Sequence, residues 1–171
     1  MKQVFLSLGS NLGERLQMLE AAKKSIARQV GSIVAESKIY ETPAWGYQAG
    51  DYLNLALEIH TKLSPDEVLR LTQAIEKAMG RRQKTQYNSE GKALYSSRCI
   101  DIDIIYYGNR IIDKPDLKIP HPRMQERNFV LFPLCDIAPD FIHPQTDKTN
   151  RELKAKLSEA SKNNIKEYSA H

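Results

Sequence analysis

Asp101 and Asp103 are separated by one residue inside an apolar, β-branched run of the chain. Alternate residues of a strand share a face, so both carboxylates point one way, while Ile100, Ile102 and Ile104 point the other way into a core. Two neighbouring carboxylates repel each other unless a cation lies between them, and Mg²⁺ is commonly held by one or two carboxylates together with substrate phosphates. A surface strand that carries two aspartates without any function fits this spacing equally well.

The segment from Arg81 to Arg98 precedes this run and concentrates positive charge. It holds five basic residues and one acidic residue, so its excess equals the whole chain's net charge of +4. It has few aliphatic residues, which is typical of a long loop, and such loops in compact domains are usually functional or disordered. A basic loop leading into a carboxylate strand favours a small polyanionic ligand that is neutralised from both sides. A solvated loop without a function is the alternative.

Composition and length limit the class of protein. At 171 residues, with 41% hydrophobic and 27% charged residues, the chain is expected to form a single globular domain over residues 1–171. No apolar run approaches the roughly 20 residues that cross a bilayer, and the N-terminus does not resemble a secretory leader. Cys99 and Cys135 lie far apart among apolar residues and are predicted to be buried free thiols. These features predict a cytoplasmic protein.

Hydrophobic periodicity predicts the elements that position these residues. Alternating apolar residues predict strands over residues 3–9, 32–41 and 52–61. A helix with apolar residues at helical spacing is predicted to end at Gly31, and Asn11 with Glu14 has the form of a capping box at its start. A second helix is predicted from a Ser64–Glu67 capping box to a glycine stop at position 80.

The last third of the chain holds six of its eight prolines and has room only for short elements. Gly108 and Asn109 predict a hairpin-type turn after the aspartate strand. Short helices are predicted around residues 129–135 and 151–157, and the polar residues 158–171 are expected to be a frayed tail.

The order of these elements predicts the fold. From residue 3 to residue 107 they run strand–helix–strand–strand–helix–strand, which is the ferredoxin-like pattern. We therefore expect an α+β sandwich, a mainly antiparallel sheet with helices packed on it.

Four motifs spread along the chain add a second line of evidence. They are residues 6–13 (LSLGSNLG), residues 41–46 (ETPAWG) with 51–54 (DYLN), residues 98–103 (RCIDID), and residues 120–124 (PHPRM) with 127–131 (RNFVL). Together, over about residues 3–140, they resemble the 6-hydroxymethyl-7,8-dihydropterin pyrophosphokinase family. The resemblance implies a ferredoxin-like enzyme of folate biosynthesis that transfers a pyrophosphoryl group from ATP to the pterin hydroxymethyl oxygen and releases AMP.

The resemblance also implies roles around the triphosphate. Asp101 and Asp103 would hold two Mg²⁺ ions that arrive with ATP. Arg81, Arg98 and His121 would be catalytic, since a guanidinium group matches phosphate oxygens in a bidentate fork. The implied nucleotide-binding residues are Gln73 and Glu76, on the expected exposed side of the second helix, and Arg81, Lys84, Tyr95, Arg98, Ile104, Lys118, His121 and Arg127.

A second implied set would bind the pterin. It consists of Thr42, Pro43, Trp45, Tyr52, Asn54 and Phe129. A flat heteroaromatic ring fits between aromatic side chains, and an amide can both donate to and accept from its edge. Tyr52 and Asn54 are two residues apart in a predicted strand and therefore share a face.

The sequence departs from the common family pattern before the aspartate strand. Leu94-Tyr95-Ser96-Ser97-Arg98 replaces the usual Arg-Trp-Gly-Pro-Arg, and residues 88–92 lengthen the basic loop. The basic segment and the aspartate pair also fit two other classes: a nucleic-acid-binding ferredoxin-like module, and a Mg²⁺-dependent nucleotidyl- or glycosyltransferase that uses the aspartate pair. The pyrophosphokinase hypothesis expects small-molecule substrates, no nucleic-acid or membrane partner, and a monomer.

Overall fold

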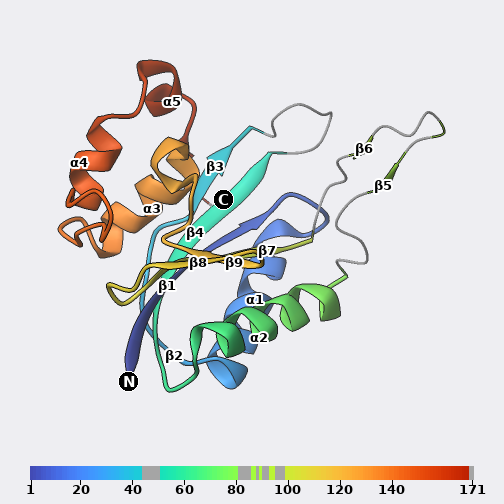
Figure 1. Cartoon of the computed structure of the whole chain (residues 1–171). Helices are drawn as coiled ribbons and strands as arrows, with labels where there is room; N and C mark the ends of the chain where they lie inside the picture. Colours follow the sequence, from blue (N-terminus) through green and yellow to red (C-terminus); the bar gives the residue numbers. More distant parts are fainter. Residues whose placement is uncertain (44–50, 81–85, 88, 90–92, 95–98, 170–171) are drawn as a thin grey trace.

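A six-stranded sheet runs through the molecule, and all its pairings are antiparallel (Figure 1). The computed structural model describes residues 1–43, 51–80, 86–87, 89, 93–94 and 99–169. The strand order is β10–β3–β4–β1–β7, and β2 also pairs with β4. The strands are β1 (Lys2–Ser10), β2 (Ser32–Glu36), β3 (Tyr40–Thr42), β4 (Tyr52–Thr61), β7 (Asp101–Tyr107) and β10 (Lys166–Glu167).

Helices cover both faces of this sheet (Figure 1). Residues of α1 (Arg15–Gln29) and α2 (Pro65–Ala78) pack on one face, and those of α3 (Asn128–Ile137) and α4 (Asn150–Ala155) pack on the other. Both β2 and β3 lie beside β4, β4 lies beside β1, and β1 lies beside β7. This arrangement confirms the predicted ferredoxin-like α+β architecture.

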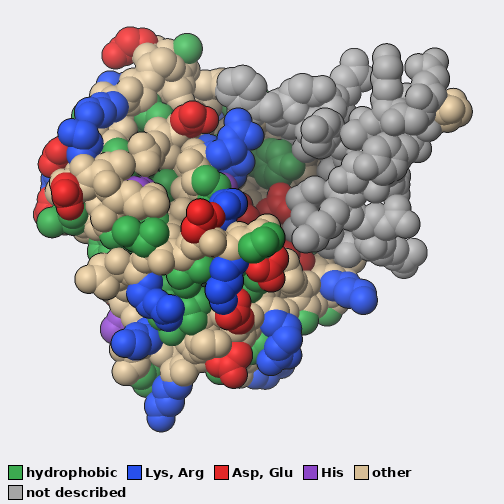
Figure 2. Space-filling model, in the orientation of Figure 1, with side chains coloured by type: hydrophobic (Ala, Val, Ile, Leu, Met, Phe, Trp, Pro, Cys, Tyr) green, Lys and Arg blue, Asp and Glu red, His purple; other side chains and the backbone are tan. Residues whose placement is uncertain are grey.

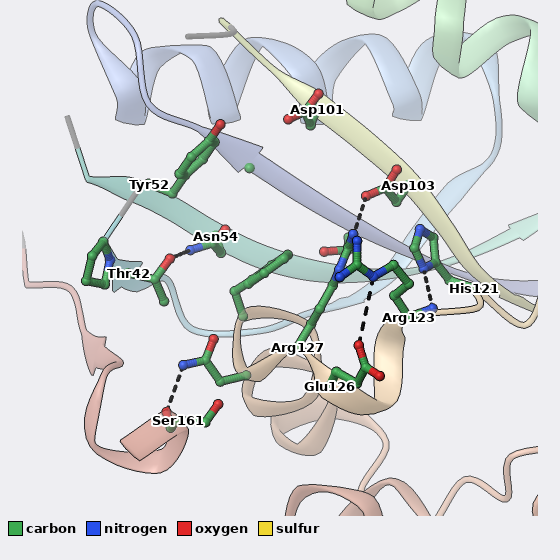
Figure 3. Close-up of a pocket in the computed structure, with 15 residues that line it drawn as sticks. Thr42, Tyr52, Asn54, Asp101, Asp103, His121, Arg123, Glu126, Arg127 and Ser161 are labelled. Atoms are coloured by element: carbon green, nitrogen blue, oxygen red, sulfur yellow. Dashed lines mark hydrogen bonds and ion pairs between the residues drawn. The ribbon is translucent and has the colours of Figure 1, made fainter. Parts of the chain in front are cut away.

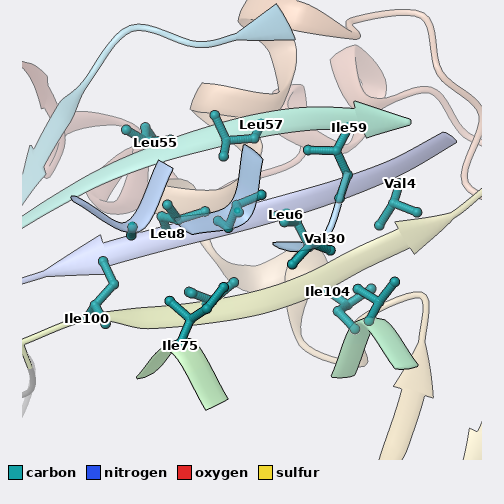
Figure 4. Packing of buried hydrophobic residues seen from close by; sticks show 14 of the residues in the cluster. Val4, Leu6, Leu8, Val30, Leu55, Leu57, Ile59, Ile75, Ile100 and Ile104 are labelled. Carbon is teal, nitrogen blue, oxygen red and sulfur yellow. The ribbon is translucent and has the colours of Figure 1, made fainter. Parts of the chain in front are cut away.

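The core under α1 and α2 follows directly from strand alternation. Val4, Leu6 and Leu8 of β1 point to this side and are buried (Figure 4). Ile102 and Ile104 of β7 join them, as the sequence predicted. Burying a side chain of this size contributes about 1.5–3 kcal/mol relative to leaving it exposed, so this face of the sheet fixes the strand register.

The opposite face of the same strands carries the second core at one end only. Phe5 of β1 and Ile105 of β7 pack there against Leu131 and Leu134 of α3. Towards the other end of this face, β1 carries the small residues Ser7 and Gly9, and β7 carries Asp101 and Asp103. One end of this face is therefore packed against α3, and the other end is open to polar groups.

The two predicted helix starts have different outcomes. The Ser64 hydroxyl accepts from the Glu67 backbone N–H at 3.2 Å, and the Glu67 carboxylate accepts from the Ser64 N–H at 2.7 Å, which confirms the capping box of α2. The box predicted for α1 is wrong: the helix begins after Glu14, which makes no side-chain cap. Asn11 is buried at the end of β1, and Gly13 with φ +68° turns the chain before the helix begins.

The strand predicted over residues 32–41 is divided into β2 and β3. Ser37 lies at the division, where its hydroxyl accepts from the Ala56 N–H at 2.8 Å. Its own N–H donates to the Ala56 carbonyl at 3.0 Å. The Asp136 carboxylate of α3 accepts from the Lys38 N–H at 3.1 Å, so side-chain contacts from Ser37 and Asp136 interrupt the regular strand pairing here.

Two further expectations for the C-terminal half are wrong. The turn at Gly108 does not pair the following strand with β7, since β8 (Ile112–Lys114) pairs with β9 (Leu117–Ile119). Residues 158–169 are not a frayed tail: they contain α5 (Glu159–Asn163) and β10, which pairs with β3. Ser158 caps α5, and the pairing of β10 holds the end of the segment against the sheet. The predicted short helices are confirmed as α3 and α4.

A few smaller elements complete the described chain. They are the 3-10 helix η1 (Met124–Glu126) and, inside the basic segment, the two-residue pair β5 (Gln86–Tyr87) and β6 (Ala93–Leu94). Cys99 and Cys135 are free but only half-buried, which corrects the expectation of full burial. Within the described residues, no helix has the length and apolar character needed to cross a membrane.

Candidate active site

The site lies on the sheet face that carries α3, at the end away from the second core. Gly9 of β1 pairs with Asn54 of β4 on one side and with Asp101 of β7 on the other. One step along the sheet, Ser7 pairs with Asp103 on the same β7 side. Because Ser7 and Gly9 of β1 are small, they form a low floor in the middle of the site. The Asn54 amide of β4 borders this floor on one side, and the two carboxylates of β7 border it on the other.

A cleft of about 700 Å³ lies over this floor (Figure 3). Its walls come from β3, β4, β7, the start of α3, η1 and α5. The lining residues are Ser7, Gly9, Thr42, Pro43, Tyr52, Asn54, Asp101, Asp103, His121, Arg123, Glu126, Arg127, Asn128, Phe129 and Ser161. All of the predicted pterin and metal residues that the structure describes therefore meet in one cleft.

The two aspartates lie as the strand pattern predicts. Asp101 and Asp103 are part-exposed in the cleft, whereas the isoleucine between them, Ile102, is buried on the other face. The Arg127 guanidinium reaches to 4.0 Å from the Asp103 carboxylate (Figure 3). The cleft thus places an arginine beside one of the paired carboxylates.

Glu76 of α2 is not on the exposed side of its helix, which corrects the expectation from the sequence. Its side chain is 5% exposed, and its carboxylate accepts from the backbone N–H of Ile102 at 3.1 Å. β7 lies at the end of the strand order, so this N–H points away from β1 and needs another acceptor. Gln73, three residues earlier, is exposed as expected.

A second, smaller hollow of about 320 Å³ adjoins the cleft at β7. It is lined by Leu69, Gln73, Glu76, Ile102, Asp103, Ile104, Pro115, Asp116, Leu117, Lys118, His121 and Pro122. All the predicted nucleotide residues that the structure describes, except Arg127, line this hollow. Asp103 and His121 line both hollows, so the two spaces meet at these side chains.

His121 is held in a defined tautomer. Its backbone N–H donates to the Ile105 carbonyl of β7 at 3.1 Å, and its Nδ1 accepts from the Arg123 N–H at 3.3 Å. Burial lowers the pKa of His121 to about 4, helped by the charges of Arg127 and Arg123. The ring is therefore neutral at pH 7 with its proton on Nε2, which leaves an N–H donor for a ligand.

Two arginines bring positive charge to the cleft. Burial lowers the pKa of Arg127, and the nearby Asp103 and Asp101 oppose that effect, so the group keeps its charge at neutral pH. The guanidinium carbon of Arg127 lies 5.4 Å from the centre of the Phe129 ring. Arg123 lies 3.8 Å from Glu126 at the same end of the cleft. The Arg127 guanidinium therefore packs against one face of the Phe129 ring.

The amide of Asn54 has a fixed orientation. Its nitrogen donates to the Thr42 hydroxyl at 2.9 Å and to the Tyr40 carbonyl at 3.3 Å. Its oxygen therefore lies on the side of Gly9, where a Cβ atom built on that glycine would come within 3.2 Å. Tyr52 and Asn54 point into the cleft from the same strand face (Figure 3), which confirms the predicted shared face.

Five predicted site residues lie outside the described residues: Trp45, Arg81, Lys84, Tyr95 and Arg98. Six cleft residues were missed as candidates, namely Ser7, Gly9, Arg123, Glu126, Asn128 and Ser161. The first five flank or belong to the quoted motifs, so strand register and helix position could have indicated them. Ser161 is far from every motif, and no local pattern connects it to the cleft.

These features define a ferredoxin-like α+β protein with two adjoining hollows that share a carboxylate and a neutral imidazole. A family model described as 7,8-dihydro-6-hydroxymethylpterin-pyrophosphokinase matches residues 5–139. The chain therefore belongs to this family. It is an enzyme of the pyrophosphokinase class, a transferase of folate biosynthesis that acts on small molecules.

Named relatives agree with the family model. The chain is 41% identical over 149 residues to the 2-amino-4-hydroxy-6-hydroxymethyldihydropteridine pyrophosphokinase of Porphyromonas gingivalis, covering 86% of this chain and 97% of the relative. It is 36% identical over 155 residues to the protein of that name from Aquifex aeolicus, covering 90% and 91%. The folic acid synthesis protein FOL1 of Dictyostelium discoideum is 42% identical over 155 residues, which cover 90% of this chain but 22% of that longer protein.

Solved structures share the fold at low identity. A crystal structure of an HPPK-DHPS in complex with substrates has a TM-score of 0.69 at 17% identity, covering 90% of this chain. Wild-type HPPK-DHPS of Plasmodium falciparum has a TM-score of 0.70 at 17% identity, covering 91%. The chain spans 43% and 44% of the length of those two chains.

Proposed function

We propose that the chain transfers the pyrophosphoryl group of ATP to the hydroxymethyl oxygen of 6-hydroxymethyl-7,8-dihydropterin and releases AMP. The observation that carries this proposal is the junction of the two hollows at Asp103 and His121. A reaction between two separately bound molecules needs their reacting atoms in contact, and binding them in adjoining spaces supplies that contact. The family membership supports the choice of substrates.

The larger cleft is proposed to bind the pterin. Tyr52 and Phe129 both line it, and a flat ring system fits between two aromatic side chains. The oriented oxygen of Asn54 offers an acceptor to the ring edge. Thr42 and Pro43 close the same end, and Trp45 is assigned there from the motif alone.

The smaller hollow is proposed to bind the nucleotide. Gln73, Glu76, Ile104 and Lys118 line it and match the positions that the family resemblance indicated. Lys118 forms an ion pair with Asp113. The triphosphate would extend from here towards the junction.

Asp101 and Asp103 fit a magnesium site. They present hard carboxylate oxygens from one strand face, and no cluster of three or more potential metal ligands occurs within the described part of the chain. Mg²⁺ fits such a partial site because it commonly takes its other ligands from phosphates and water. When bound, the metal would neutralise charge on the phosphate oxygens. A count of two ions rests on the family resemblance.

The remaining charged and polar groups would stabilise the transferring phosphates. The Nε2–H of His121 can donate to a phosphate oxygen. The Arg127 guanidinium, which lines the larger cleft, can donate two parallel hydrogen bonds to phosphate oxygens. In the transfer, the hydroxymethyl oxygen forms a bond to the β-phosphorus and its proton is released to water. The bond from that phosphorus to the α–β bridging oxygen breaks, and AMP leaves with this oxygen.

The basic segment is proposed to complete the phosphate site. Arg81 and Arg98 are proposed as catalytic contacts to the triphosphate, with Lys84 and Tyr95 as further nucleotide contacts. These assignments rest on the motifs of the sequence. We also propose that residues 1–171 form one pyrophosphokinase domain, active as a cytoplasmic monomer.

The nucleic-acid-binding alternative has less support. Figure 2 shows acidic and basic side chains interspersed over the described part of one face of the molecule. Nucleic-acid-binding surfaces instead concentrate Lys and Arg, because they neutralise a row of phosphates. Outside the basic segment, the described part of this face therefore lacks the concentrated Lys and Arg of a nucleic-acid-binding surface.

Product analysis distinguishes the proposed reaction from the alternatives. The protein is incubated with ATP, MgCl₂ and 6-hydroxymethyl-7,8-dihydropterin, and nucleotides are separated by ion-exchange chromatography. The proposal expects AMP that depends on the pterin, and loss of AMP in Asp103→Asn. ADP would indicate transfer of one phosphoryl group, and free pyrophosphate would indicate nucleotidyl transfer. Either product in place of AMP contradicts the proposal.

A further inference from the structure

Asn128 is a buried amide that lines the cleft and has no role in the proposal above. It is the first residue of α3, lies between Arg127 and Phe129 in the chain, and is 7% exposed. Its nitrogen donates to the backbone carbonyl of Ser161 at 2.8 Å (Figure 3). A carbonyl oxygen can only accept, so the atom that faces Ser161 must be the amide nitrogen.

The amide oxygen of Asn128 is therefore the end available to the cleft. Among the described residues, it makes no hydrogen bond. Leaving a buried carbonyl oxygen without a donor costs free energy, and a ligand donor would recover it. The cleft that Asn128 lines is the space where such a donor can enter.

Asn54 of β4 is another amide whose nitrogen is bound by the protein and whose oxygen is directed to the cleft. Its nitrogen is held by the Tyr40 carbonyl and the Thr42 hydroxyl, so its oxygen is also directed to the cleft. The cleft thus presents two amide oxygens, one from β4 and one from α3, each oriented by a protein acceptor behind it. Such a pair is suited to a ligand whose edges carry N–H donors.

We propose that Asn128 is a second hydrogen-bond acceptor for the pterin, oriented by the carbonyl of Ser161. The inference rests on the proposed function, because the 2-amino group and ring N–H groups of a dihydropterin are the donors that it would bind. Ser161 acts through Asn128 as a positioning residue. The role adds to those of Tyr52, Asn54 and Phe129.

The C-terminal segment is built to hold this carbonyl in place. The Ser158 hydroxyl accepts from the Ser161 N–H at 3.1 Å and caps α5. Farther along, β10 pairs with β3, and the Tyr168 N–H donates to the Ile39 carbonyl at 2.8 Å. The segment lies beyond residues 5–139, so one cleft wall comes from outside the part that the family model matches.

Two substitutions of Asn128 distinguish a contact from its oxygen to the pterin from a purely structural hydrogen bond to Ser161. Asn128→Ala removes both the cleft-facing oxygen and the donor to Ser161. Asn128→Asp keeps an oxygen towards the cleft and loses the amide donor. Asn163→Ala, at an exposed position of α5, is the matched control. Each protein is titrated by calorimetry with 6-hydroxymethyl-7,8-dihydropterin in the presence of Mg²⁺ and α,β-methylene-ATP, and separately with the nucleotide analogue.

The inference expects Asn128→Ala to weaken pterin binding by about three- to tenfold, the range of one neutral hydrogen bond. Nucleotide binding should stay within about twofold of the wild type, and Asn128→Asp, which keeps an oxygen but loses the donor that orients it, should weaken pterin binding less than Asn128→Ala does. Equal weakening in both variants, or no weakening in Asn128→Ala, overturns the inference and leaves the proposed function standing. A wild-type protein that binds no pterin overturns both.

Discussion

The carboxylate of Glu76 accepts a hydrogen bond from the backbone N–H of Ile102 at 3.1 Å, and Ile102 is the residue between Asp101 and Asp103. Through this contact, α2 holds the outer side of β7 at the point where both proposed metal ligands project. The lining of the nucleotide hollow and the orientation of the metal ligands therefore depend on one buried side chain.

Removing the Glu76 carboxylate should weaken both stability and turnover. Glu76→Ala leaves the buried N–H of Ile102 without its acceptor, which costs about 1–3 kcal/mol of unfolding free energy. Glu76→Gln keeps an acceptor oxygen and should lose less. Urea unfolding and the rate of AMP release measure the two effects. If both variants unfold like the wild type, the contact to Ile102 does not stabilise the strand.

The paired aspartates should be needed for turnover far more than for pterin binding. Asp103→Asn removes a negative oxygen from the proposed metal site, and we expect AMP release to fall by at least about 100-fold. Pterin affinity should change little, because Tyr52, Asn54 and Phe129 remain. Calorimetry and product analysis measure the two quantities. An equal loss of affinity and rate would assign the carboxylate a structural role.

His121 should remain neutral across the physiological pH range. Burial, with help from Arg127 and Arg123, lowers its pKa to about 4 from an ordinary value of 6.5. Between these values the unfolded chain binds more protons than the native state, so this group's contribution to stability is full above about pH 6.5 and is lost as the pH falls towards 4. A ring-proton NMR titration of His121, assigned with His121→Gln, should show its midpoint near 4. A midpoint near 6.5 would refute a buried, neutral ring.

Adding a methyl group to the floor of the cleft should interfere with the pterin. In Gly9→Ala the Cβ atom would lie 3.2 Å from the Asn54 oxygen and 3.6 Å from the Tyr52 ring. The amide must shift, so we expect pterin affinity to fall by about tenfold, the equivalent of one hydrogen bond. Affinity for α,β-methylene-ATP should be unchanged, since Gly9 does not line the smaller hollow. Unaltered pterin affinity would exclude this part of the floor from the pterin site.

The sequence predicted the features that depend on local periodicity. Asp101 and Asp103 share a face because strands alternate, and Ser64 caps α2 because its partner is three residues away. These signals need no knowledge of the tertiary fold. The ferredoxin-like order of elements followed from the same local patterns.

Apart from the local capping box of α1, the errors occur where distant parts of the chain decide the outcome. A glutamate on a helix is usually solvated, but Glu76 is buried beside the edge of β7, where the Ile102 N–H donates to its carboxylate. Residues 158–169 have a polar composition, and they are ordered because β10 meets β3. The contact from Asn128 to Ser161 joins residues 33 positions apart.

The fate of the β-phosphorus tests the central claim most directly. The protein is supplied with ATP labelled at the β-phosphorus, Mg²⁺ and 6-hydroxymethyl-7,8-dihydropterin, and the products are separated and counted. Transfer across the junction of the two hollows predicts that the label moves to the pterin and that one AMP forms for each pterin consumed. Label that stays with ADP, or that leaves as free pyrophosphate, would contradict the account.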